Sequence, residues 1–247
     1  MRKTKKHSSS FLNDDISRIL SDETPFAINE SFRALQTNVL YLPIADKCKK
    51  IAITSSVASE GKTYISINLA ITLASNSNKK VLLIDLDMRM TRIKKLLQKR
   101  IPVAKTTTGL SEYLVGIDQT PNIIKADIPN LDILFSGKKN TNPVGLINSE
   151  KMSNLLDSLS ENYDYIIVDT PPVNMVTDAL LILDKVNGYI LSARSNHSTI
   201  NSLISATETI SKVGGEIFGV VLTAVNNKKI GKSGKAYPSG EYVYGEH

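Results

Sequence analysis

Short apolar segments alternate with amphipathic segments along most of the chain. The apolar segments are nearly continuous in Ile, Val and Leu, which is typical of strands buried on both faces of a parallel sheet. We predict six strands, at residues 50–55, 81–85, 131–135, 165–169, 189–193 and 218–222. Helices are predicted at residues 28–42, 62–75, 145–161, 178–183 and 200–213. This alternation predicts an α/β fold in which helices flank a doubly wound, mostly parallel sheet.

The two ends of the chain lack this pattern. Residues 1–27 are polar and basic, and we expect them to form a flexible N-terminal segment. Residues 226–247 are rich in Lys, Gly, Ser and Tyr, which predicts a flexible C-terminal tail. The remaining residues, 28–225, are long enough for one large α/β domain.

The first predicted helix, residues 28–42, is amphipathic. Its apolar face is expected to consist of Phe32, Leu35, Val39 and Leu42. Glu30, Arg33 and Gln36 are expected on the opposite, polar face. A helix of this kind packs its apolar face on the core and leaves the polar face in water.

The net charge of the chain is carried by its ends. Of the formal net charge of +6, residues 1–10 contribute +4 and residues 226–247 contribute +2, so the part between them is neutral. A nucleic-acid-binding domain would carry a basic face on its body, and nucleic acid is therefore not an expected partner. Basic ends are suited to an anionic membrane surface or simply to solvation by water.

Two classes of protein are disfavoured by the composition. Cys48 is the only cysteine, so an intramolecular disulfide and a site of several thiolates are excluded. No apolar run approaches the roughly 20 residues that a membrane-spanning helix needs. We therefore expect a chain that reaches a membrane only through a partner or through its surface charge.

The segment from residue 51 to residue 70 has the order of a phosphate-binding site. A buried strand leads into a loop of small residues, then Gly61-Lys62-Thr63, then a helix. This is the G-x-x-x-x-G-K-[ST] pattern of a P-loop (here residues 56–63), with Ser56 in place of its first glycine. Loop N–H groups would bind phosphates, the lysine would reach the β- and γ-phosphates, and the threonine hydroxyl would contact Mg²⁺. The expected nucleotide-binding residues are Ser59, Glu60, Gly61, Lys62, Thr63 and Tyr64.

Three carboxylates follow two of the predicted strands. Asp85 and Asp87 lie at the end of residues 81–85, and Asp169 ends residues 165–169. Ligands in parallel sheets bind at the carboxyl ends of the strands, where these side chains would meet. Thr63, Asp85 and Asp169 are the expected Mg²⁺ ligands, partly through water. Asp85 and Asp87 are suited to orienting or deprotonating an attacking group, and the expected catalytic residues are Lys62, Asp85, Asp87 and Asp169.

The ordered set of motifs resembles one family. It consists of ESFRALQTN at residues 30–38, SEGKT, LLIDLDMR, GLSEYLVG at residues 109–116, NPVGLINS at residues 142–149, DYIIVDTPPV and FGVVLTAV. The set is similar to the bacterial tyrosine kinase family of capsular and exopolysaccharide biosynthesis, in its Gram-positive cytoplasmic type. The resemblance extends over about residues 28–225, together with a tyrosine-bearing tail.

This resemblance implies an ATP- and Mg²⁺-dependent tyrosine autokinase that regulates polysaccharide polymerisation and export. The tail tyrosines Tyr237, Tyr242 and Tyr244 would be phosphorylated by a neighbouring subunit in a ring. Glu30 and Arg33 match the family's ring-forming E-x-x-R-x-x-R motif, whose last position holds Gln36. The implied partners are the cytoplasmic segment of a membrane-embedded chain-length protein, as activator, and a tyrosine phosphatase. The chain would then be cytoplasmic and peripheral at the inner face of the membrane.

The sequence departs from the family pattern at three further positions. Val57 and Ser59 stand where the family has Pro and Gly, and Thr223 stands where it generally has an Asn that faces the base.

Two other functions share the sheet and the P-loop. A partitioning-type ATPase would carry a further lysine early in the loop, and residues 55–60 contain none. A subunit that binds nucleotide without catalysis would not need the three aspartates.

Overall fold

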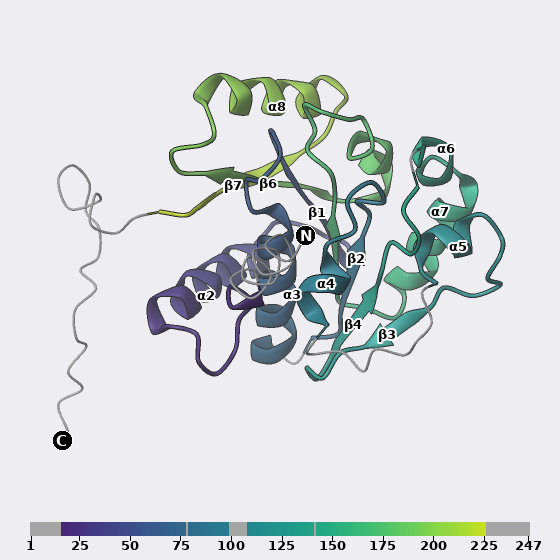
Figure 1. Cartoon of the computed structure of the whole chain (residues 1–247), viewed down its shortest axis with the longest axis horizontal. Coiled ribbons are helices and arrows are strands. Elements are labelled where there is room, and N and C mark those ends of the chain that lie inside the picture. Colours follow the sequence, from purple (N-terminus) through teal and green to yellow (C-terminus); the bar gives the residue numbers. More distant parts are fainter. Residues whose placement is uncertain (1–15, 78, 99–107, 141, 226–247) are drawn as a thin grey trace, which may run out of the picture.

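The computed structural model describes residues 16–77, 79–98, 108–140 and 142–225. Its strands are β1 (Lys49–Ser55), β2 (Val81–Asp85), β3 (Ile123–Lys125), β4 (Leu131–Leu134), β5 (Tyr165–Asp169), β6 (Gly188–Arg194) and β7 (Ile217–Thr223). Its helices are α2 (Phe26–Leu40), α3 (Lys62–Ser77), α4 (Ile93–Leu97), α5 (Leu110–Leu114), α6 (Val144–Ile147), α7 (Glu150–Ser160), the 3₁₀ helix η1 (Leu180–Lys185) and α8 (Ile200–Lys212). Figure 1 shows how they are arranged.

The strands within these ranges form one sheet in the order β3-β4-β2-β5-β1-β6-β7. Neighbouring strands are parallel except for β3 and β4, which are antiparallel. The predicted doubly wound, mostly parallel sheet is therefore confirmed, and all six predicted strands are present. The prediction missed the short edge strand β3, whose residues are only partly buried and form no long apolar run.

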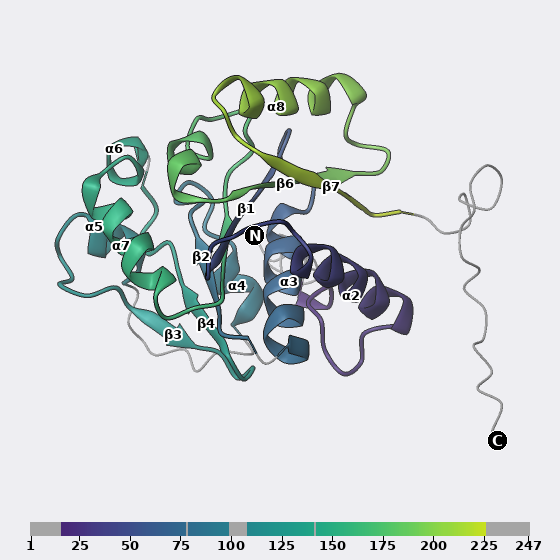
Figure 2. The same cartoon turned by 180° about the vertical axis from the view of Figure 1, so that it is seen from behind.

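Helices cover both faces of the sheet, as the two opposite views show (Figures 1 and 2). One apolar core joins α2, α3 and α4 to alternate strand residues such as Ile51, Ile53 and Leu83. The other joins α5, α6, α7, η1 and α8 to the residues between them, such as Ala52 and Leu82. Successive strand side chains point to opposite faces, so the nearly continuous apolar runs serve both cores.

The predicted helix at residues 145–161 is two helices, α6 and α7. The break falls at Ser149, whose hydroxyl oxygen accepts a hydrogen bond from the Met152 N–H at 3.2 Å and caps α7. A serine side chain satisfies an N–H that has no partner within the helix, so a new helix begins there.

The expectation of a flexible N-terminal segment is wrong for residues 16–27, the part of it that the structure describes. Ile19 and Leu20 are buried in the core that contains α3. Asn68 of α3 holds this segment from both sides: its Oδ1 accepts from the Leu20 N–H at 2.9 Å, and its Nδ2 donates to the Arg18 carbonyl at 3.0 Å. Two adjacent apolar residues in a polar stretch are enough to anchor it, because their burial removes apolar surface from water.

Gln36 does not lie on the polar face of α2. Its side chain is 6% exposed and donates from Nε2 to the Thr72 carbonyl of α3 at 3.1 Å. Gln36 follows Phe32 by four residues and precedes Val39 by three, so helix geometry places it beside both. The expected shared face with Glu30 and Arg33 is therefore wrong for this residue, which ties α2 to α3 instead.

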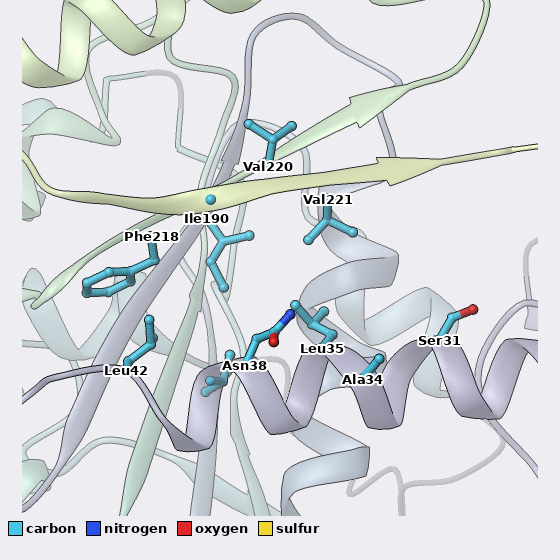
Figure 3. Close-up of a pocket in the computed structure, with 11 residues that line it drawn as sticks. Ser31, Ala34, Leu35, Asn38, Leu42, Ile190, Phe218, Val220 and Val221 are labelled. Atoms are coloured by element: carbon cyan, nitrogen blue, oxygen red, sulfur yellow. The ribbon is translucent and has the colours of Figure 1, made fainter. Parts of the chain in front are cut away.

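A groove of about 260 Å³ lies between α2 and the edge strand β7 (Figure 3). Leu35 of α2 and Leu42, two residues after the end of α2, line it on one side, and Phe218 and Val221 of β7 on the other. Val220 points away from α2 and is 55% exposed.

Within the described ranges, no helix combines the length and the apolar character that crossing a bilayer requires.

Candidate active site

Sheet topology brings the predicted site residues together. The P-loop follows β1, and β5 lies directly between β1 and β2. Asp85 at the end of β2 pairs in register with Asp169 at the end of β5. The chain beyond them continues this pairing, since the Leu86 N–H donates to the Asp169 carbonyl at 2.9 Å. The lysine of the P-loop and the three aspartates therefore lie at one edge of the sheet.

Lys62 is paired with Asp87 in this structure. Its Nζ lies 2.9 Å from Asp87 Oδ2, and both side chains are largely buried, at 12% and 5% exposed. The other oxygen of Asp87 accepts from the Met90 N–H at 2.9 Å. Burial lowers the pKa of Lys62, but the charges of Asp169 and Asp87 outweigh it and raise this pKa above its usual value. Lys62 is thus held in its charged form.

Asp169 is buried beside the first turn of α3. Its Oδ1 accepts from the Ser66 hydroxyl at 3.1 Å, and the Thr63 side chain lies close enough to lower its pKa. Burial raises the pKa of Asp169, and the charge of Lys62 and the side chain of Thr63 partly oppose this effect. The threonine and the aspartate that were expected to share Mg²⁺ are therefore in contact.

Asp85 is buried with only half of its hydrogen-bonding capacity used. Its Oδ2 accepts from the Ser136 hydroxyl at 3.1 Å, whereas its Oδ1 has no hydrogen-bond partner within the described part of the chain. Burial, and then the charges of Asp169 and Asp87, raise the pKa of Asp85 well above the ordinary value. An unpaired buried carboxylate oxygen is costly, and a bound cation would remove that cost.

These residues fit a hydrated Mg²⁺. No group of three or more His, Cys, Asp or Glu residues among the described ones forms a complete protein cage for a metal. Mg²⁺ does not require one, because it keeps several waters and binds through one or two carboxylates together with substrate phosphates. The free oxygen of Asp85 and the Thr63–Asp169 contact supply donors of that kind.

The P-loop contains two residues with positive φ, Ser59 at 66° and Gly61 at 92°. A Cβ atom at Gly61 would lie 3.2 Å from the Thr223 side chain. The positive φ therefore favours glycine at position 61, and a side chain there would also crowd Thr223. Thr223 uses its hydroxyl to donate to the carbonyls of Glu60 and Ala193, at 2.9 and 3.1 Å.

The side chain of Glu60 points into the protein. It is fully buried, and its carboxylate accepts hydrogen bonds from the hydroxyls of Ser56 and Ser198 and from the Val57 N–H. Any contact of Glu60 with a nucleotide must therefore come from its backbone. The same holds for Tyr64, whose ring packs against the core and lies 5.8 Å from the Arg18 guanidinium.

Sequence reasoning missed several residues that support the site. Ser66 lies four residues after Lys62, so helix periodicity could have placed it on the same face. Arg89 donates to both oxygens of the fully buried Asp178, at 2.8 and 2.9 Å, and fixes the chain that follows Asp87. Ser136 and Ser198 approach from distant segments, and no local pattern marks them.

Two further groups of residues were expected to mediate assembly and to receive phosphate. Glu30 and Arg33 form an ion pair of 3.0 Å on α2, and both side chains are exposed. Tyr237, Tyr242 and Tyr244 lie outside the described residues.

Comparison with known proteins shows which family the chain resembles. A family model described as "AAA domain" matches residues 48–217. The putative tyrosine-protein kinase CapB of Staphylococcus aureus is 32% identical over 226 residues, which cover 91% of this chain and 93% of the relative. The crystal structure of the chimerical protein CapA2B2 matches with a TM-score of 0.75 and 33% identity, covering 83% of this chain and 89% of the other. The kinase domain of the Escherichia coli tyrosine kinase ETK matches with a TM-score of 0.74 and 30% identity, covering 87% and 80%.

The family-model match covers the range that holds the P-loop and the three aspartates. The tyrosine kinase names of these relatives favour a kinase over a partitioning ATPase or a subunit without catalysis. The chain belongs to the bacterial tyrosine kinase family and is a protein-tyrosine kinase with a P-loop nucleotide site.

Proposed function

We propose that the chain is an ATP- and Mg²⁺-dependent tyrosine autokinase of capsular or exopolysaccharide biosynthesis, which phosphorylates Tyr237, Tyr242 and Tyr244 of a second copy. The observation that carries the proposal is the buried arrangement of one lysine and three aspartates at the carboxyl ends of β2 and β5 and the start of α3. Phosphoryl transfer depends on positioning and on charge stabilisation, and this arrangement provides both.

Each residue would have a separate role in the transfer. The P-loop N–H groups bind phosphate oxygens, and Lys62 leaves Asp87 for the β- and γ-phosphates. Mg²⁺ held beside Thr63, Asp85 and Asp169 would neutralise charge on the same oxygens. Asp87, no longer paired, is the carboxylate placed to accept the proton of the incoming tyrosine hydroxyl. Asp85 and Asp169 keep their places through Ser136 and Ser66.

The test is phosphotyrosine formation by the full-length chain with ATP and Mg²⁺, with and without the cytoplasmic segment of a candidate activator. Mass spectrometry should place the phosphate mainly on the three tail tyrosines. A variant in which all three are Phe should still phosphorylate an added peptide with the tail sequence, which distinguishes loss of the acceptor from loss of the enzyme. Phosphate mainly on Tyr41, Tyr113 or Tyr189 would contradict the proposal.

Assembly is the second part of the proposal. Glu30 and Arg33 are exposed on one face of α2, which leaves them free to contact another copy, and the buried Gln36 cannot add to that contact. A ring would depend on these two residues. Light scattering of Glu30→Ala/Arg33→Ala should show smaller particles than the unphosphorylated wild type. The exposed ion pair Lys212–Glu208 on α8 offers a matched control, Glu208→Ala.

Location and partners complete the proposal. The chain would be cytoplasmic and peripheral at the inner face of the membrane, bound through the cytoplasmic segment of a membrane-embedded chain-length protein, and a tyrosine phosphatase would reverse its modification. Support comes from the family resemblance and from the basic residues 1–10, since Lys and Arg near an anionic membrane surface contribute about 1 kcal/mol each. Co-purification of the full chain with membranes only when the activator is present would test it.

A further inference from the structure

The P-loop is held from outside by the last residue of β6 and by the segment that follows it. The Arg194 guanidinium donates from Nη1 to the Ser59 carbonyl at 3.2 Å. Nε2 of His197 lies 3.0 Å from the Ala58 carbonyl oxygen. Both contacts join residues more than 130 positions apart in the chain, so the shape of the loop is not determined by the loop alone.

The most buried of these contacts centre on Glu60. Its Oε1 accepts from the Ser56 hydroxyl at 2.7 Å and from the Ser198 hydroxyl, and its Oε2 accepts from the Val57 N–H at 2.9 Å. Ser198 is itself oriented, because its oxygen accepts from the Arg194 N–H at 2.7 Å. We call Ser56, Glu60 and Ser198 the Glu60 brace.

The loop needs external support because its conformation is unfavourable. Ser59 has φ of 66°, in the left-handed region that costs non-glycine residues energy. Such a conformation persists only when surrounding contacts impose it. Ser56, by contrast, has no positive φ, so the glycine of the usual pattern is not needed there for conformational reasons. A serine at this position contributes a hydroxyl that glycine lacks.

We infer that Ser56, Glu60 and Ser198 are positioning residues for the nucleotide: they fix the P-loop so that its N–H groups point at the phosphates. Ser56, which stands in place of the first P-loop glycine, then contributes to nucleotide binding. The inference rests on the nucleotide site of the proposed function. It goes beyond that function because it assigns part of the phosphate affinity to the Glu60 brace, whose side chains do not contact the phosphates.

The brace acts on binding more than on chemistry. Loop N–H groups contact phosphates in the ground state and in the transition state alike, and loss of such uniform binding raises KM without lowering kcat. The three aspartates and Lys62 act chiefly in the transition state. A KM-against-kcat split therefore separates the brace from these catalytic residues.

The experiment uses the full-length chain and a fluorescent ADP analogue with Mg²⁺. Ser56→Ala and Ser198→Ala should each weaken binding about tenfold, since each loses a hydrogen bond to a buried charged group. The KM for ATP should rise in parallel, with kcat changed less than about twofold. Ser56→Gly, which restores the usual P-loop glycine, should weaken binding as Ser56→Ala does. Because both serines act through Glu60, the double variant should lose less than the product of the single losses.

Ser195→Ala is the matched control, in the same segment as Ser198. Its main chain pairs with β7, and its hydroxyl makes no hydrogen bond within the described residues. Glu60→Gln should retain most of the affinity and Glu60→Ala should lose it, because Gln can still accept from the Val57 N–H and donate to a serine oxygen. A charge-based role for Glu60 predicts equal losses in both, and that result would overturn the inference.

Normal ADP binding by folded Ser198→Ala and Ser56→Ala, alongside wild type that binds, would contradict the brace alone. No binding by wild type would contradict the proposed nucleotide site and the brace with it. Circular dichroism and thermal unfolding establish that each variant is folded. If an alanine variant does not fold, the test uses Glu60→Gln and Ser56→Gly instead. Tight binding by Ser56→Gly together with loss of binding by Glu60→Gln would contradict the inferred role of the Glu60 brace.

Discussion

The P-loop and the end of β2 each contain a buried carboxylate, Glu60 and Asp85. The surroundings of these two carboxylates differ. Glu60 is fully buried and accepts three hydrogen bonds from nearby donors. Asp85 is 1% exposed and accepts one, which leaves Oδ1 without a partner in the described chain. The pKa of Asp85 is raised well above its usual value, first by burial and then by the charges of Asp169 and Asp87.

The difference separates a structural carboxylate from one that is prepared for a ligand. A buried carboxylate with all its donors in place costs little and fixes its surroundings. A buried carboxylate that has an unpaired oxygen and lies beside two other carboxylates lowers the stability of the fold, which is typical of functional sites. The same type of group can thus report opposite roles, and its hydrogen-bond partners distinguish them.

The largest effect should come from Lys62, the cation between these two regions. Lys62→Met should lower phosphotyrosine formation by about a hundredfold or more, since it removes a charge aimed at the transferred phosphoryl group. It should also lower the free energy of unfolding by about 3 kcal/mol, because Asp87 keeps a buried charge without its partner. Kinase assays and urea unfolding measure the two effects.

The double variant Lys62→Met/Asp87→Asn sharpens this test. It should regain most of the lost stability while remaining inactive, because the unpaired charge is gone. Failure of the second substitution to restore stability would show that the unpaired charge of Asp87 is not the cause of the loss.

The next effect contrasts the two carboxylates directly. Asp85→Asn should lower turnover by tenfold or more and raise the thermal unfolding midpoint by about 2–4 °C for each kcal/mol of relieved burial cost. Glu60→Gln should lower the midpoint, because it weakens hydrogen bonds that the charge strengthens. Differential scanning calorimetry without nucleotide compares them. A lower midpoint for Asp85→Asn would contradict the view that its charge is costly.

The difference in the free energy of unfolding between wild type and Asp85→Asn should depend on pH with a defined sign. Folded Asp85 has a raised pKa, so the folded state binds the proton more tightly than the unfolded state. At a pH below the unfolded pKa, Asp85 is neutral in both states and wild type matches Asp85→Asn most closely. As the pH rises through the raised folded pKa, wild type loses stability relative to the variant. Mg²⁺-dependent activity should fall on the acid side of the same transition, because protonated Asp85 is a poor ligand.

The smallest effect concerns the strained position in the P-loop. Ser59→Gly should raise the free energy of unfolding by about 0.5–1 kcal/mol, since glycine adopts a positive φ without steric cost. Ser205→Gly, at an exposed position within α8, should lower it by a similar amount. Equal destabilisation by both would mean that Ser59 is not strained.

The sequence predicted the sheet well because its strands are buried on both faces. β2 and β5 are fully buried runs of aliphatic residues that end in an aspartate, and the structure confirms both bounds. β3 and Gln36 could not be predicted in the same way. β3 is three residues long and half-buried, and Gln36 is a polar residue whose burial depends on a carbonyl in α3.

The candidate site was predictable where chemistry follows local order. Gly61, Lys62 and Thr63 are adjacent in the chain, and parallel strands bring Asp85 and Asp169 to the same edge. The structure adds that Lys62 contacts Asp87, and that Ser198 reaches Glu60 across 138 positions of sequence. The first contact depends on where β2 lies in the sheet relative to β1, and the second on β6 lying beside β1, which local sequence does not encode.

With the roles proposed above for Lys62 and Asp87, their ion pair would make catalysis conditional on the nucleotide. As long as the pair is intact at 2.9 Å, the carboxylate placed to take a proton from tyrosine is neutralised and occupied. Phosphate must compete for the lysine, and only that exchange exposes the base. An acceptor tyrosine that arrives first therefore meets a site that cannot deprotonate it. The ion pair would then enforce an order, donor before acceptor, with two side chains.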